Sequence, residues 1–300
     1  MARRGGWLAL FRVQDGTSLT SERASWTAPA ASSTIWTMPF PPHAGARTIT
    51  GHALPVIVAD GPTDVARALA REMVDVIRAV RTDERAAVLG LATGRTPLAL
   101  YREFARLVAA ERLPLDALVT VQLDEYLDLP RTHPASFRAT MRRTLFDEIG
   151  HPDSRAHFPV ECHERDDLTA SCARFEQLLV ELGGVDWQVL GIGRNGHIAF
   201  NEPGSSADSR TRVVTLDEST RAANRSAFAD DEEVPQRAVT MGIATIRAAR
   251  RLRIVALGSG KAEIVHEFLH ARVGPDLPAT LLRDHPGAEL WLDGAAAAEL

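Results

Sequence analysis

The distribution of hydrophobic and polar residues changes near residue 50. Residues 1–50 are rich in Ser, Thr, Ala and Pro, and their apolar positions follow neither the period of a strand nor that of a helix. We therefore predict a low-complexity or disordered N-terminal extension over residues 1–50. From residue 51 to residue 300 short apolar runs alternate with amphipathic segments, which predicts a single folded domain.

This alternation predicts an α/β fold. Apolar runs predict strands over residues 53–59, 86–92, 117–123, 185–193, 251–260 and 288–297. A helical period predicts helices over residues 61–81, 96–111, 136–149, 168–183, 238–250 and 261–273. Strands that alternate with helices form a mostly parallel, Rossmann-like sheet with helices on both faces. Ligands then bind at the C-terminal ends of the strands, where we expect the active site.

The helix starts carry recognisable capping residues. Thr96 is predicted to cap the second helix, with Pro97 in its first position, and Thr63 or Asp64 is predicted to cap the first helix.

Composition excludes several classes of partner. The formal net charge of −5 offers no basic surface for nucleic acid, and no apolar run reaches the length of a membrane span. Two cysteines, Cys162 and Cys172, are too few for a disulfide framework, so we expect reduced thiols and a cytoplasmic protein. Arg provides nearly all the positive charge, since Lys261 is the single lysine among 34 basic residues. A position that keeps lysine in such a chain is a candidate for a compact ammonium site.

Two loops have the features of phosphate sites. In "LATGRTP" (residues 91–97), Gly94 lets the backbone approach a ligand and the following helix offers unpaired N–H groups. An ordinary glycine turn with a good cap remains the alternative for this loop. In "LGSGKAE", Lys261 stands at a helix start, but Val255 and Ala262 replace residues that a nucleotide-binding P-loop requires. This second loop suits a terminal phosphate without a nucleotide or a metal.

A pair of carboxylates directly follows the predicted strand over residues 117–123. If the extended backbone continues, the side chains of Asp124 and Glu125 point to opposite faces, so one of them can enter the cleft. A lone carboxylate at a strand end is a candidate general base, and a solvated acidic turn is the alternative.

The stretch "GIGRNGHIAFNEP" (residues 191–203) imitates a dinucleotide-binding loop. Its glycines match G-x-G-x-x-G, but Pro203 and Gly204 leave no room for the helix that such a cofactor needs. The same loop carries His197 and Glu202, a pair that suits a proton shuttle, although a histidine satisfied within a turn is the alternative. The chain's three asparagines all lie within residues 195–224.

Four further histidines suggest no metal site. His133, His151, His157 and His163 lack the spacing of known ligand sets, and we expect neither a metal nor a redox cofactor. The loops together imply a small phosphorylated metabolite and proton-transfer chemistry.

Five sequence blocks resemble those of the glucosamine-6-phosphate deaminase family, in the same order. These are "LGLATGRTP", "LDEYLDLPRTHPASF", "GIGRNGHIAFNEPGSS", "SRTRVVTL" and "LGSGK". The resemblance covers about residues 55–295 and implies a sugar-phosphate isomerase/deaminase domain over residues 51–300. It implies conversion of glucosamine 6-phosphate to fructose 6-phosphate and ammonia, with an amino-sugar phosphate as the small-molecule partner. It leaves a homo-oligomer possible.

The resemblance also implies roles for individual residues. Asp124 would move a proton between C2 and C1 of the open sugar, and His197 would serve the ring oxygen with support from Glu202 and Asn195. Residues 216–235 would form a mobile lid. The 6-phosphate would be bound by Gly94, Arg95, Thr96 and Lys261.

Four departures from the family pattern bear on these roles. Arg95 stands where a small residue is usual. Arg225 lies one position from the lid arginine that reaches the phosphate in the family, so either Arg225 binds the phosphate from a shifted lid or the substrate differs. Val214 replaces a basic residue of regulated members, whose longer C-terminal tail this chain lacks, so we expect an unregulated enzyme. A 6-phosphogluconolactonase-like hydrolase and a non-catalytic sugar-phosphate sensor are the alternative functions. The "DEY" and "FNEP" blocks argue against the hydrolase, and the intact set of proton-transfer residues argues against the sensor.

Overall fold

A computed structural model describes residues 46–81, 85–160 and 167–300. Most of the predicted N-terminal extension, together with Cys162 and His163, lies outside the described residues. Residues 46–49 were predicted as part of that extension, but they form a strand that pairs with its neighbour in antiparallel orientation. Their alternation is too short, and their exposure too high, to produce a clear strand signal in the sequence.

The core of the fold is a mostly parallel sheet of eight strands. The strand order is β1-β2-β11-β10-β7-β3-β4-β6, and β1 alone runs antiparallel to its neighbour. The order in space corresponds to Ala46–Ile49, Val56–Ala59, Ala288–Asp293, Leu252–Ala256, Trp187–Gly191, Ala87–Leu91, Leu118–Gln122 and Ala156–His157. This arrangement confirms the predicted α/β class.

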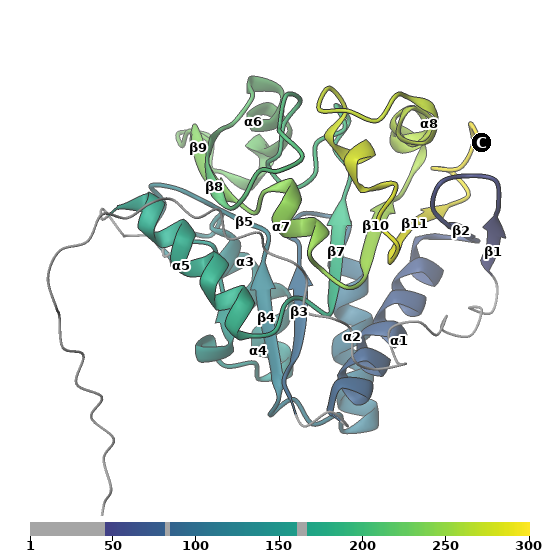
Figure 1. The fold of residues 1–300 in the computed structure, drawn as a ribbon. Helices are drawn as coiled ribbons and strands as arrows, with labels where there is room; N and C mark the ends of the chain where they lie inside the picture. Colours follow the sequence, from purple (N-terminus) through teal and green to yellow (C-terminus); the bar gives the residue numbers. More distant parts are fainter. Residues whose placement is uncertain (1–45, 82–84, 161–166) are drawn as a thin grey trace, which may run out of the picture.

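The connections place helices on both faces of this sheet (Figure 1). From β2 through β3 and β4 to β6 the chain moves in one direction across the sheet, and from β6 through β7 to β10 and β11 it moves back. Right-handed crossovers therefore put the helices of the first half on one face and those of the second half on the other. The helices are α1 (Pro62–Arg81), α2 (Leu98–Glu111), α3 (Phe137–Met141), α4 (Asp147–Ile149), α5 (Leu168–Glu181), α6 (Glu218–Asn224), α7 (Ile243–Arg247) and α8 (Ala262–His270).

The reversal of direction occurs between β3 and β7, which are neighbours in the sheet. The loop after β3 and the loop after β7 lead to opposite faces and leave a crevice between them at the C-terminal edge. Such a switch point is where open α/β sheets bind ligands. The topology therefore brings the loop of Gly94 and the loop of His197 together.

A second, antiparallel sheet of three strands lies beside this edge. Its order is β5 (Asp124–Tyr126), β9 (Arg237–Thr240) and β8 (Arg212–Thr215). The predicted continuous helix over residues 238–250 is therefore wrong in its first part, because residues 237–240 form the central strand and only Ile243–Arg247 is helical. Ala238, Val239 and Thr240 are fully buried, so their apolar run reflects a central strand rather than a helix face.

The helix starts differ from the predicted caps. Helix α2 begins at Leu98, with Pro97 at the cap position and no side-chain cap hydrogen bond, so Thr96 does not cap it. Helix α1 begins at Pro62, which places Thr63 and Asp64 inside its first turn. Ser136, by contrast, caps α3 by accepting a hydrogen bond from the Ala139 amide at 3.0 Å.

A buried ionic cluster joins α1 to the sheet. Glu72 lies on α1 and accepts hydrogen bonds from Trp187 Nε1 at 3.0 Å and from Arg253 Nε at 2.7 Å. Arg251 Nη1 lies 3.3 Å from the same carboxylate. Burial alone would raise the pKa of Glu72, but Arg253 and its neighbours hold that pKa below its ordinary value. Removing the carboxylate would leave two buried guanidinium groups without this partner.

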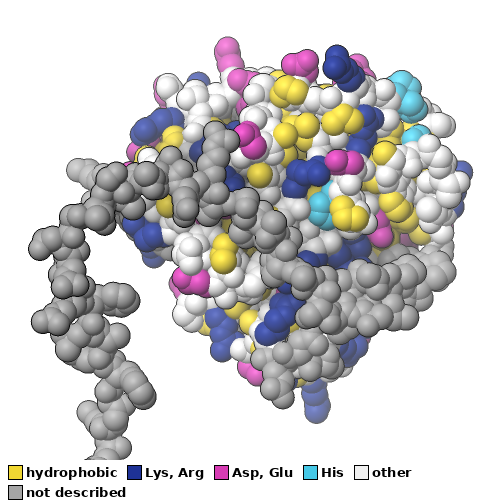
Figure 2. Space-filling model, in the orientation of Figure 1, with side chains coloured by type: hydrophobic (Ala, Val, Ile, Leu, Met, Phe, Trp, Pro, Cys, Tyr) yellow, Lys and Arg dark blue, Asp and Glu magenta, His cyan; other side chains and the backbone are white. Residues whose placement is uncertain are grey.

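The visible surface carries charges of both signs. In Figure 2, basic and acidic side chains are interspersed over this face instead of gathering into one patch. Within the described part of the chain, no helix is both long and apolar enough to cross a bilayer.

Candidate active site

A cleft of about 840 Å³ lies at the C-terminal edge of the sheet. It is bounded by the loops after β3, β4, β7 and β10 and by α6. The residues that line it include Gly94, Arg95, Asp124, Arg194, Asn195, His197, Ala199, Thr220, Asn224 and Lys261. It therefore collects residues from every loop that the sequence singled out.

Asp124 and Glu125 point in opposite directions, as strand alternation predicts. Asp124 lines the cleft and is only 7% exposed. Glu125 points away from it and accepts hydrogen bonds from the amides of Phe137 and Arg138, both at 2.9 Å, at the start of α3. One carboxylate therefore holds a helix in place while the other is available to a ligand.

The environment of Asp124 favours its protonated form. Burial, and secondarily the charge of Glu125, raises the pKa of Asp124 to about 8. A carboxyl group with such a pKa accepts a proton far more readily near neutrality than an ordinary aspartate. A cationic ligand group in the cleft would stabilise the carboxylate and prepare it to act as a base.

His197 lies beside a hydrogen-bond network centred on Glu202. Asn195 Nδ2 donates to Glu202 Oε2 at 2.8 Å, and Thr220 Oγ1 donates to Glu202 Oε1 at 2.5 Å. His197 Nδ1 lies 3.5 Å from Glu202 Oε2, which is an electrostatic contact longer than a normal hydrogen bond. Burial would raise the pKa of Glu202, but contacts from His197, Thr220 and Asn195 outweigh it and lower that pKa to about 2. Glu202 is thus a stable anion beside the imidazole.

The loop that carries His197 needs its glycine at position 193. A Cβ atom there would lie 2.4 Å from the imidazole ring, so any side chain would displace His197. The Gly193 amide also donates to the His197 carbonyl at 2.9 Å, and Asn195 Oδ1 accepts from the His197 amide at 3.2 Å. Residues 192–211 contain no helix, which agrees with rejecting a dinucleotide-binding loop.

One end of the cleft is cationic. Lys261 Nζ donates to the Ile192 carbonyl at 2.6 Å, which fixes the ammonium between the loop after β7 and the start of α8. Burial, followed by the charges of Arg194 and Arg95, lowers the pKa of Lys261. Lys261, Arg194 and Arg95 therefore lie close enough to repel one another at this end of the cleft. Such a group of cations favours the binding of a multiply charged anion.

Arg194 was not predicted from the sequence. It occupies a variable position of the glycine loop, and its guanidinium lies beside Gly260 of the Lys261 loop. The sequence did show a charged residue inside a loop that was already assigned to the site. Its role could not be predicted, because the hydrophobic periodicity of a sequence does not tell which way a loop side chain points.

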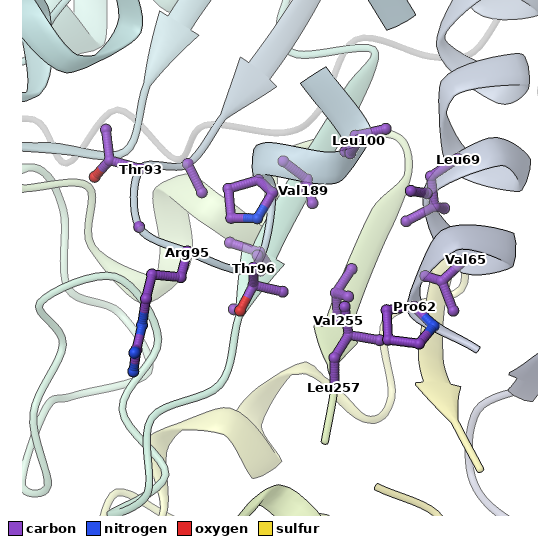
Figure 3. Close-up of a pocket in the computed structure, with 16 residues that line it drawn as sticks. Pro62, Val65, Leu69, Thr93, Arg95, Thr96, Leu100, Val189, Val255 and Leu257 are labelled. Carbon is purple, nitrogen blue, oxygen red and sulfur yellow. The ribbon is translucent and has the colours of Figure 1, made fainter. Parts of the chain in front are cut away.

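Thr96 and Arg225, two of the predicted phosphate-binding residues, do not line the cleft. Thr96 lines a small apolar cavity of about 80 Å³ behind the loop after β3, not the cleft itself (Figure 3). Arg95 borders both spaces and extends away from the apolar side chains of that cavity. Arg225 is not among the cleft-lining residues, because its guanidinium donates to the carbonyls of Phe228 at 3.0 Å and Asp230 at 2.8 Å. In this conformation, then, Arg225 is not placed with the other cations, and its predicted role stays a prediction.

A metal site is not evident in the part of the chain that the structure describes. No three His, Cys, Asp or Glu side chains among these residues are grouped as ligands for an ion. The arrangement instead offers a buried carboxyl, an imidazole beside an anion, and a cationic end at one cleft.

The chain resembles proteins of known family. Residues 60–291 match the family model for glucosamine-6-phosphate isomerases/6-phosphogluconolactonase. A glucosamine-6-phosphate deaminase from Rhodopirellula baltica is 46% identical over 215 residues, covering 72% of this chain and 85% of that protein. Glucosamine-6-phosphate deaminase 1 from Bacillus subtilis is 46% identical over 211 residues, covering 70% of this chain and 86% of that protein.

Solved structures share the fold. A monomeric glucosamine-6-phosphate deaminase superimposes with a TM-score of 0.76 at 41% identity, covering 82% of this chain and 99% of that one. The 6-phosphogluconolactonase from Trypanosoma brucei has a TM-score of 0.60 at 23% identity and covers 82% of this chain and 98% of that one, which establishes a shared fold alone.

Proposed function

The chain belongs to the family of glucosamine-6-phosphate isomerases and 6-phosphogluconolactonases, and we propose that it is an enzyme that converts glucosamine 6-phosphate to fructose 6-phosphate and ammonia. The relatives that match at 46% identity are named glucosamine-6-phosphate deaminases. The observation that carries the proposal is the shared cleft of Asp124, His197 and Lys261. A base, a proton shuttle and an anion site at one place suit the isomerisation of a phosphorylated sugar.

Substrate binding starts at the cationic end. A phosphomonoester carries up to two negative charges near neutrality, and Lys261, Arg95 and Arg194 lie where they can neutralise them. The backbone at Gly94, with its positive φ of 103°, leaves room for the phosphate to approach the loop. With the phosphate anchored there, the sugar carbons extend along the cleft toward Asp124 and His197.

Ring opening is the first chemical step. The proton of the anomeric hydroxyl must leave and the ring oxygen must gain a proton, after which the C1–O bond to the ring breaks and an aldehyde forms. His197 supplies the group that handles this proton, and the Glu202 anion stabilises the imidazolium as it forms. Asn195 keeps the carboxylate in place.

Isomerisation and amine release follow. Asp124 removes the proton from C2, and a proton is then delivered to C1. In the same conversion the ammonium group loses one proton and O1 gains one, so the amino aldehyde becomes a protonated C2 imine with a hydroxyl group on C1. Water adds to the imine carbon, and ammonia leaves to give the ketone at C2. The substrate's ammonium group lies next to C2 and favours ionised Asp124, which offsets the raised pKa of that carboxyl in the unliganded cleft.

A lactonase function is less well supported. Hydrolysis of a lactone involves no proton removal from carbon, and the relatives that match at 46% identity are named glucosamine-6-phosphate deaminases. A non-catalytic sensor would bind the sugar phosphate without turnover, and the chain's relatives are enzymes by name.

The test is a substrate comparison with the purified chain. Ammonia and fructose 6-phosphate are each measured with glucosamine 6-phosphate, with galactosamine 6-phosphate and with no substrate, and lactone hydrolysis is measured with 6-phosphogluconolactone. The proposal expects ammonia and ketose in equal amounts from glucosamine 6-phosphate. Lactone hydrolysis without ammonia release would replace the proposal by the hydrolase alternative, and binding without turnover would replace it by the sensor.

A further inference from the structure

The short helix α6 contacts the hydrogen-bond network around Glu202, although it lies outside the loop of residues 191–203 that carries His197 and Glu202. This helix lies within the segment 216–235 that the resemblance predicted as a lid. Its residues Thr220 and Asn224 line the cleft. Thr220 is only 4% exposed, although the residues before it, 217–219, are exposed. Its side chain is therefore directed inward by the packing of α6 against the site.

The hydroxyl of Thr220 holds one oxygen of Glu202. Thr220 Oγ1 donates to Oε1 at 2.5 Å, and Asn195 Nδ2 donates to Oε2 at 2.8 Å. The carboxylate is thus fixed by two donors, one from its own loop and one from α6. A single donor would leave the carboxylate free to rotate about its last bond, and the Oε2 that faces His197 Nδ1 would lose its position.

The C-terminal end of α6 contacts the strand β5, which carries Asp124 and Tyr126. Asn224 lies near the side chain of Tyr126, two residues after Asp124. The Tyr126 ring packs against Phe228, which follows α6, with ring centroids 5.6 Å apart. The helix is therefore docked at both ends on the two elements that carry the reacting groups, and its position and the geometry of Glu202 are linked.

We propose that Thr220 is a positioning residue, whose hydroxyl orients Glu202 so that His197 is correctly held only while α6 is docked. This inference rests on the proposed function, since it concerns the proton shuttle of that reaction. Thr220 does not touch the reacting atoms in this role, and acts through Glu202. Its removal should slow the chemistry that uses His197 and leave phosphate binding at the cationic end largely intact.

The experiment separates the hydroxyl from the shape of the side chain. Thr220→Val keeps the β-branched volume without the donor, and Thr220→Ser keeps the donor without the methyl group. Ala222→Val, on the exposed part of the same helix, is the matched control for the helix propensity of valine. Thermal unfolding of each variant checks that the fold is kept.

We expect Thr220→Val to lower kcat about 10- to 100-fold, the effect of losing a hydrogen bond to a charged group, with KM changed less than about threefold. Thr220→Ser and Ala222→Val should stay within about threefold of the unsubstituted protein. An equal loss in Thr220→Ser and Thr220→Val would overturn the proposal, because the hydroxyl would then not be the important group.

A double-mutant cycle with Glu202→Gln gives the decisive readout. If Thr220 acts through the Glu202 carboxylate, adding Thr220→Val to Glu202→Gln should cost less than about twofold more in kcat. Multiplicative effects would mean that Thr220 acts by another route and would overturn the inference. Failure of the proposed function shows itself differently: the unsubstituted protein would then release no ammonia from glucosamine 6-phosphate at all.

Discussion

Replacing Asp124 by asparagine should make the folded protein more stable at alkaline pH while removing its activity. The amide matches the shape of a protonated carboxyl, so the substitution mimics the neutral form of Asp124 at every pH. The base that removes the C2 proton is then absent, and we expect kcat to fall by about 10²- to 10⁴-fold. Stability should move in the other direction, because burial of the ionised carboxylate is a cost that only the unsubstituted protein carries.

The size of this effect follows from the pKa of Asp124, which rises from an ordinary 3.8 to about 8 in the folded protein. Between these values the unfolded chain has lost the proton and the folded protein still binds it, so stability falls as pH rises. The loss continues until the pH passes about 8, at about 1.4 kcal/mol per pH unit. Between about pH 5.5 and about pH 8.5 the free energy of unfolding should therefore decrease by about 3 kcal/mol on account of this one group.

Urea unfolding of both proteins at about pH 5.5 and about pH 8.5 measures this directly. The gain in stability of Asp124→Asn over the unsubstituted protein should be about 3 kcal/mol larger at the higher pH. Glu148→Gln, which removes an exposed carboxylate from α4 at the opposite end of the sheet, is the control and should show no such pH-dependent gain. A gain that is equal at both pH values would refute the argument that Asp124 is buried as a neutral acid.

Three further predictions concern binding, stability and regulation. Lys261→Arg should raise KM by about tenfold or more in steady-state assays despite keeping the charge, because a guanidinium cannot keep the 2.6 Å contact with the Ile192 carbonyl and bind phosphate from the same place; an unchanged KM would show that the lysine is incidental. Glu72→Gln should lower the free energy of unfolding by about 3–5 kcal/mol in urea titrations, because Arg251 and Arg253 lose the buried Glu72 carboxylate and Arg253 keeps only the more exposed Glu289 as an ion-pair partner, and a loss below about 1 kcal/mol would contradict the role of this cluster. Ammonia release should depend hyperbolically on substrate with or without N-acetylglucosamine 6-phosphate, because Val214 offers no cation to an anionic effector; a sigmoidal curve that this compound makes hyperbolic would contradict the prediction.

The main sheet could be predicted because its strands are buried on both faces. Runs such as Ala87–Leu91 and Leu252–Ala256 are buried throughout and read as continuous apolar segments. The strands Ala46–Ile49 and Arg212–Thr215 have a mixture of exposed and half-buried residues, so their pattern is weak. The strand Arg237–Thr240 was assigned to a helix because its burial comes from the second sheet, a tertiary arrangement that no local period records.

The site could be located but not fully assembled from the sequence. Parallel strands end at one edge, so Asp124, His197 and Lys261 could be expected near one another once the strands were placed. The contributions of Arg194 and Thr220 depend on where a loop and the helix α6 fold back, which their local sequence does not encode. The raised pKa of Asp124 likewise arises from burial by segments distant in sequence.

The fate of the hydrogen on C2 tests the central claim most directly. Glucosamine 6-phosphate deuterated at C2 is converted by the purified protein, and the product is examined by mass spectrometry and NMR. Isomerising deamination predicts that the C2–D bond breaks in every turnover, so fructose 6-phosphate forms with the deuterium either at C1 or lost to water, and Asp124→Asn forms almost none. A deaminated aldose that still carries deuterium at C2 would show that the amine leaves without proton transfer between C2 and C1, and would contradict the assignment of Asp124 as the base.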